Sequence, residues 1–112
     1  MNDKLSNKLI EAVKANNIDL VKELLKDKDI DVNARDDDDD DGDTALIWAA
    51  YLGYTDIVKM LLKHKDIDVN IKDDINDIEL KCKNNSALKW ASIRGYTNII
   101  KMINDYKLKN NK

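Results

Sequence analysis

A single cysteine and a single histidine are the first residues in this sequence that could carry chemistry. A Cys–His pair can act as nucleophile and base when a third group orients the base. Here His64 lies at the end of an expected helix and Cys82 lies in a connecting segment, so a catalytic pairing is not favoured. No Gly-rich phosphate loop, H-E-x-x-H motif or second Cys/His pair for zinc occurs. We therefore predict that the chain is not an enzyme and has no cofactor.

A run of aspartates is the second feature with possible chemistry. Asp37, Asp39 and Asp41 followed by Gly42 reproduce the D-x-D-x-D-G opening of an EF-hand calcium loop. The bidentate Glu expected at position 12 of such a loop is Trp48 here, and no helix precedes the run. Adjacent carboxylates repel one another and stay hydrated, which favours a solvated loop. We assign no metal ligands, and keep a calcium-responsive module built on the Asp-rich loop 36–43 as the alternative function.

The chain that carries these groups is internally repeated. The segment IWAAYLGYTDIVKM at 47–60 recurs as KWASIRGYTNIIKM at 89–102. The segment at 9–33 likewise matches the one at 46–70, and both end in KDIDVN. Each copy has the apolar spacing of two short helices joined by a turn and followed by an extended tail. One such unit cannot bury its apolar faces alone, so the copies are expected to stack.

The spacing predicts helices near 5–15, 18–27, 44–52, 55–64, 86–94 and 97–106. Ser6, Thr44 and Thr55 are expected to cap the helices that they begin, because their hydroxyls can accept a backbone N–H. Gly53 is expected to end its helix in the left-handed region, and Asn16 to replace glycine at the same point of the first copy.

Two longer connecting arms separate the helical pairs. The first runs from about residue 29 to 43 and contains the aspartates. In the second, two alternating apolar runs flank the polar stretch DDIND, which predicts a short β-hairpin with its apolar side chains on one face. These runs are Ile67, Val69 and Ile71, and then Ile78, Leu80 and Cys82.

The repeated unit resembles the ankyrin repeat, whose T-P-L-H-x-A signature appears at 44–49 as Thr-Ala-Leu-Ile-Trp-Ala and at 86–91 as Ser-Ala-Leu-Lys-Trp-Ala. The tail Asp68-Val69-Asn70 resembles the closing segment of the family. Proline is absent, and Ile47 or Lys89 replaces the signature histidine. The resemblance implies an all-α, three-repeat solenoid with extended arms. We expect this solenoid to form one domain over 1–112, with repeats at about 1–35, 36–72 and 73–112.

Composition also indicates the architecture and the cellular compartment expected of such a domain. Charged residues make up 37% and aromatic residues 5%, which suits a thin helical array. A lone cysteine fits a reducing cytosol. The start of the sequence lacks a basic segment followed by an apolar run, and no apolar stretch approaches about 18 residues. We expect a cytoplasmic monomer with no membrane partner, and no nucleic-acid partner because the Lys-rich C-terminus lacks interleaved aromatics.

The resemblance implies a non-enzymatic protein-protein interaction module, with contacts from arm tips and exposed inner-helix positions. Those positions are Asp41, Asp43, Tyr51, Leu52, Ile93 and Arg94. Trp48 and Trp90 occupy the same place in successive copies. They are either packing residues between repeats or an aromatic anchor pair for a partner protein or peptide, and both interpretations stay open.

Charge is unevenly spread along the chain. Residues 27–43 carry ten acids against Lys28 and Arg35, whereas residues 80–112 carry eight bases against Asp105. Such asymmetry can serve solubility alone. The sharper hypothesis is that the acidic arm steers a partner with a basic patch toward the protein in a salt-dependent way.

Overall fold

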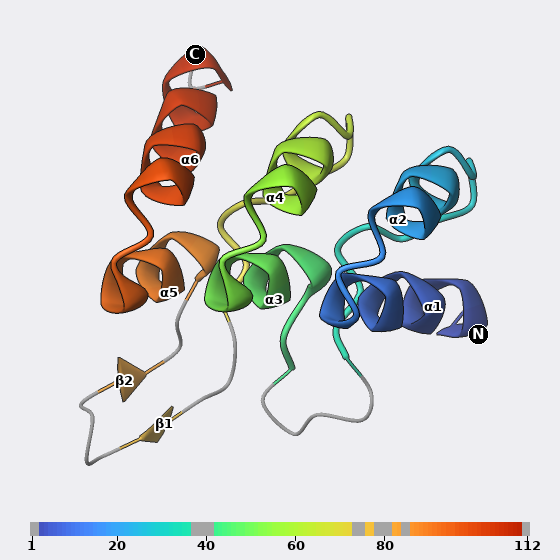
Figure 1. Ribbon diagram of the computed structural model, residues 1–112, viewed down its shortest axis with the longest axis horizontal. Helices are drawn as coiled ribbons and strands as arrows, with labels where there is room; N and C mark the ends of the chain where they lie inside the picture. Colours follow the sequence, from blue (N-terminus) through green and yellow to red (C-terminus); the bar gives the residue numbers. More distant parts are fainter. Residues whose placement is uncertain (1–2, 37–41, 73–75, 78–81, 84–85, 111–112) are drawn as a thin grey trace.

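The computed structural model describes residues 3–36, 42–72, 76–77, 82–83 and 86–110. Within these ranges the chain forms six helices and two short strands (Figure 1). In chain order they are α1 (Asp3–Lys14), α2 (Ile18–Leu25), α3 (Ala45–Leu52), α4 (Thr55–Leu62), β1 (Asn76–Asp77), β2 (Cys82–Lys83), α5 (Ala87–Arg94) and α6 (Thr97–Asn110).

The helices form two layers (Figure 1). The inner helices α1, α3 and α5 lie side by side in one row, and the outer helices α2, α4 and α6 lie side by side in a second row, above the first in this view. Each inner helix also packs against the outer helix that follows it in the chain. The three helical pairs therefore stack in sequence order, as the repeats predict.

The sequence explains which helix is buried most. α3 lies between two other inner helices, and five of its eight residues are buried. Ala45, Ala49 and Ala50 are small enough to let the neighbouring backbones approach closely. The outer helix α4 is amphipathic instead, and its fully buried residues are Ile57, Val58 and Leu61. Burying one such aliphatic side chain contributes about 1.5–3 kcal/mol.

Side-chain caps agree with the sequence prediction at one helix and differ at two. The Thr44 hydroxyl accepts the Ile47 N–H at 3.2 Å, which confirms that cap. Thr55 was a wrong choice, because α4 follows Tyr54 and has no side-chain cap. Ser6 was also wrong: α1 begins at Asp3, so Ser6 lies inside the helix and is buried. Its hydroxyl has no hydrogen-bond partner among the described residues.

Left-handed residues end the inner helices, as expected. Gly53 has φ of 78° and Gly95 has φ of 77°. Asn16 adopts φ of 56° at the matching point after α1, which confirms that asparagine replaces glycine there. This conformation reverses the chain within two residues and sends it into the outer helix.

The tails after the outer helices pack into the core. Ile30 and Val32 are buried in the first tail, and Ile67 and Val69 in the second. The side chain of Asn33 joins the two tails, since its amide donates to the Asp66 carbonyl at 2.7 Å and its oxygen accepts the Asp68 N–H at 2.9 Å. Alternation in these tails therefore reflects burial against the helices.

The predicted hairpin in the second arm is placed differently. Its first run, 67–71, contains a turn and no strand. The strands β1 and β2 pair antiparallel further along, with Asn76 opposite Lys83 and Asp77 opposite Cys82. Most of the second run, 78–82, lies outside the described residues, so the apolar face of the hairpin stays a prediction.

Two glycines allow a matched stability test. A Cβ at Gly53 would lie 2.8 Å from the Tyr96 ring, whereas one at Gly95 would meet nothing within 4 Å. Gly95→Ala should lower the free energy of unfolding by about 1 kcal/mol through backbone strain alone. Gly53→Ala should cost about 1–2 kcal/mol more, because the ring must move as well.

Urea unfolding followed by circular dichroism measures both variants. In a Tyr96→Ala background the extra cost of Gly53→Ala should disappear. Equal losses for the two glycine variants would contradict the close packing of Tyr96 on Gly53.

Candidate functional site

The register of the repeats defines two columns of residues on the inner helices. Glu11, Trp48 and Trp90 are equivalent positions, and so are Lys14, Tyr51 and Ile93. Residues of the two columns are three apart in each helix, so they share one helix face. The surface therefore changes from charged on α1 to aromatic on α3 and to aromatic and aliphatic on α5.

Lys14 and Tyr51, the first two residues of the second column, each contact the tryptophan of the next repeat. The Lys14 Nζ lies 4.7 Å from the Trp48 ring centroid. The Tyr51 ring lies 4.9 Å from the Trp90 ring, in an edge-to-face arrangement. Within α3, Trp48 and Tyr51 are also edge-to-face at 6.2 Å. A chain of cation–π and aromatic contacts thus crosses all three inner helices.

Burial separates the roles of the two tryptophans. Trp90 is 8% exposed and belongs to the core. Trp48, Tyr51 and Leu52 are half-buried and keep part of their surface in solvent, and the first two pack against that core. Ile93 is 44% exposed. The packing interpretation therefore fits Trp90, and the surface interpretation is open to Trp48.

Arg94 holds Tyr51 from the solvent side. Its guanidinium carbon lies 4.6 Å from the Tyr51 ring centroid and 5.7 Å from that of Tyr96. Its Nε donates a hydrogen bond to the Tyr96 hydroxyl at 3.2 Å. This hydrogen bond raises the pKa of the Arg94 guanidinium above its usual value.

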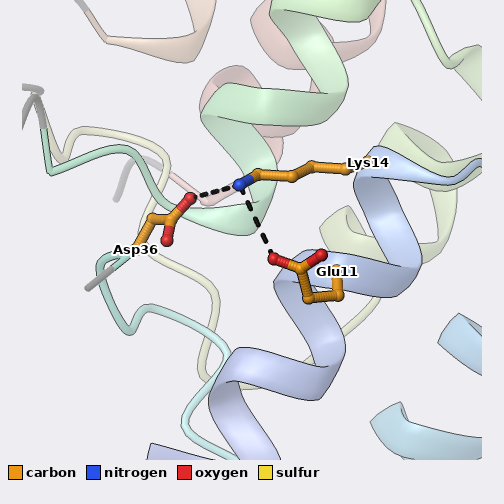
Figure 2. A network of polar contacts seen from close by, with 3 residues as sticks. All are labelled: Glu11, Lys14 and Asp36. Atoms are coloured by element: carbon orange, nitrogen blue, oxygen red, sulfur yellow. Dashed lines mark ion pairs between the residues drawn. The ribbon is translucent and has the colours of Figure 1, made fainter. Parts of the chain in front are cut away.

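A buried carboxylate holds the other end of the surface. Figure 2 shows Lys14 reaching from α1 to Asp36 in the first arm, with Nζ and Oδ2 2.7 Å apart. The Asp36 side chain is only 3% exposed. The Glu11 carboxylate lies 3.7 Å from the Lys14 Nζ, and this ion pair adds little stability because the Glu11 side chain is exposed. Sequence reasoning missed Asp36, because nothing distinguishes it from the five aspartates that follow it.

The base of the first arm is closed by backbone contacts. The Asp36 N–H donates to the Asp43 carbonyl at 2.8 Å. Arg35 donates from one guanidinium nitrogen to the Gly42 carbonyl at 2.8 Å and to the Lys72 carbonyl at 2.9 Å, so it links the two arms. The predicted contact residue Asp43 is 7% exposed, and so belongs to this base and not to an exposed tip. Asp41 lies outside the described residues.

The other chemical candidates gain no support from the geometry. His64 accepts the Asp66 N–H on Nδ1 at 3.1 Å, a contact within its own turn. Cys82 belongs to β2, in the second connecting arm. The described ranges contain no cluster of three or more metal-ligating side chains. Asp37, Asp39 and Asp41 fall outside those ranges, so calcium binding stays a prediction.

Comparison with known families agrees with the repeat architecture. The family model described as ankyrin repeats matches residues 9–112 in three copies. The chain therefore belongs to the ankyrin-repeat family. Ankyrin repeats are generally protein-protein interaction modules and typically non-enzymatic. A comparison with curated proteins finds no significant match. No helix in the described part of the chain has the length and apolarity needed to cross a membrane.

The Lys14–Asp36 contact predicts a stability effect. Lys14→Met keeps an unbranched side chain over Trp48 but removes the charge that faces the buried carboxylate. Since Lys14 is 29% exposed, we expect a loss of about 2 kcal/mol in the free energy of unfolding, below the range for fully buried pairs. Lys8→Met, at an exposed position of the same helix, should change it by less than about 0.5 kcal/mol.

Chemical denaturation of the single variants and of Lys14→Met/Asp36→Asn measures the coupling. The double variant should recover part of the loss, because the carboxylate charge is gone as well. Strict additivity of the two single changes would show that the pair does not interact.

Proposed function

We propose that this protein binds a partner protein or peptide through its inner-helix surface. The contact residues are Trp48, Tyr51, Leu52, Ile93 and Arg94, with Trp90 supporting them from the core. The observation that carries the proposal is the state of Tyr51: its ring is fixed between Trp90 and Arg94 and is still partly exposed.

A fixed and partly exposed aromatic ring suits binding for an energetic reason. Ordering a mobile side chain on association costs about 0.5–1.5 kcal/mol, and Tyr51 is already ordered by its neighbours. Tyr, Trp and Arg are also the residues that dominate binding energy in protein interfaces. Ile93 extends the surface, since its side chain is 44% exposed.

The acidic arm is proposed to guide the approach of the partner. Asp29 and Asp31 are exposed at its start, and the sequence continues with six consecutive aspartates. A partner with a basic patch would be attracted over about a Debye length of 8–10 Å. In this proposal the protein is a small cytosolic monomer, a three-repeat solenoid that holds its partner without chemistry.

Alanine variants test the surface. The double variant Tyr51→Ala/Arg94→Ala should retain about tenfold less of the specific partner than the native protein does in a quantitative pull-down from cell extract. The control Asn98→Ala/Lys101→Ala changes two exposed residues of α6 and should retain the same partner. Equal retention by both variants, with unchanged melting temperatures, would reject the inner-helix surface.

Salt dependence tests the steering role separately. With the captured partner purified, its association rate should fall as sodium chloride rises, while the dissociation rate changes little. Replacement of Asp37–Asp41 by serines should flatten this dependence. If the association rate of the native protein does not change with ionic strength, the steering hypothesis is rejected, whereas the proposed binding surface is not affected.

A further inference from the structure

The outer side of the molecule has two grooves that the inner-helix proposal does not use. One, of about 580 Å³, lies between the ends of α2 and α4, and the other, of about 490 Å³, between α4 and α6. His64 and its neighbours Lys63 and Lys65 border both. We call these the lysine grooves.

The floor of each lysine groove is apolar. Leu25 and Met60 line the first, and Leu62, Met102 and Tyr106 line the second. All five side chains are half-buried and pack against the core, so part of each faces the groove. The floor is recessed between helices, and a convex apolar surface is needed to cover it.

The rims of the lysine grooves are strongly basic. Seven lysines line the two grooves against three aspartates: Lys22, Lys26, Lys28, Lys59, Lys63, Lys65 and Lys109 against Asp27, Asp66 and Asp105. One of those acids, Asp27, already accepts the Asp29 N–H on its carboxylate at 2.9 Å. The chain as a whole carries a net charge of −3, so this basic face runs against the overall balance.

Local stability explains only some of these lysines. Lys22 and Lys59 lie in the last turns of α2 and α4, where a cation favours the helix dipole. Lys26 pairs with Glu23 at 3.3 Å. Lys63 and Lys65 follow the end of α4, are exposed, and form no ion pair with any residue that the structure describes. Their charge is available to a ligand.

We propose that the lysine grooves bind an acidic amphipathic helix of a partner protein. Its apolar face lies on the floor of Leu25, Met60, Leu62, Met102 and Tyr106, and its carboxylates meet Lys63 and Lys65 on the shared rim. A helix is convex and about 10 Å wide, so its side chains reach a recessed floor. A flat bilayer or a nucleic-acid duplex would neutralise the lysines and leave that floor uncovered. This surface belongs to the outer helices, so it is independent of the proposed inner-helix contact.

A defined peptide probes the grooves directly. We would use a fluorescent helix of about 18 residues, five turns, with Glu on one face and Leu on the other. The comparison ligands are its scrambled isomer of equal charge, a duplex DNA and phosphatidylserine vesicles. Fluorescence anisotropy, or co-sedimentation for vesicles, should show the helix binding about tenfold tighter than the scrambled isomer, as one or two buried leucines would give.

Charge variants locate the contact. Lys63→Glu/Lys65→Glu should weaken helix binding by about tenfold, and Lys63→Gln/Lys65→Gln by about threefold, since charge is removed without reversal. The control Lys8→Glu/Lys101→Glu alters net charge equally at exposed positions that line neither groove, and should change binding by less than about twofold. Tyr51→Ala/Arg94→Ala should leave it unchanged.

Several outcomes would overturn the proposal. Equal affinity for the helix and its scrambled isomer would mean that the apolar floor is not engaged. Tighter binding of DNA or vesicles would assign the lysines to another class of ligand. Equal weakening by the control variant, or a loss on Tyr51→Ala/Arg94→Ala, would place the peptide elsewhere. Circular dichroism spectra and melting temperatures of all variants show whether each compared protein is folded.

Discussion

Burial between neighbouring helical pairs is the constraint on which this structure depends. No pair has enough apolar surface within itself, and the middle helix α3 shows this most clearly, with five of eight residues buried. Leu46 and Ala50 are nearly inaccessible because a repeat lies on either side. Stability in such an array is the sum of repeat and interface contributions, so every contact between repeats also holds its neighbours in register.

The same constraint creates the surface that the inner helices present. Lys14 and Tyr51 each extend over the tryptophan position of the next repeat. Their side chains are thereby fixed without being buried, which is the condition for a low entropic cost of binding. Asp36 adds an electrostatic anchor from the arm, so the arm base and the first inner helix behave as one unit. The side chains that hold neighbouring repeats together therefore also form the proposed binding surface.

Repeat comparison in the sequence was enough to predict the helical pairs, the left-handed turns and the equivalence of Trp48 with Trp90. It could not separate their burial. The Tyr51 ring covers Trp90, whereas the Lys14 side chain covers Trp48 only partly. The burial of each tryptophan therefore depends on the side chain that the preceding repeat places against it. The Asp36 contact was hidden for a similar reason: the six consecutive aspartates have identical propensities, and only the closure of the arm base selects one of them. The alternating tail at Ile67 and Val69 was interpreted as a strand because burial against helices gives the same period of two.

The distribution of charge is best understood through the helix ends. After two of the three outer helices the chain continues through a lysine-flanked segment, Lys26-Asp27-Lys28 after α2 and Lys63-His64-Lys65 after α4. Part of this charge offsets the negative end of the helix dipole, and this part repeats wherever an outer helix ends. The acidic arm instead leads into the inner helix α3, and its Asp43 directly precedes the Thr44 cap, where negative charge favours the N-terminal end of the helix dipole. The basic grooves thus lie on the outer layer, whereas the acidic arm leads into the inner helix α3. The two proposed contacts lie on different layers, and we expect partners of opposite charge to be distinguished by that separation.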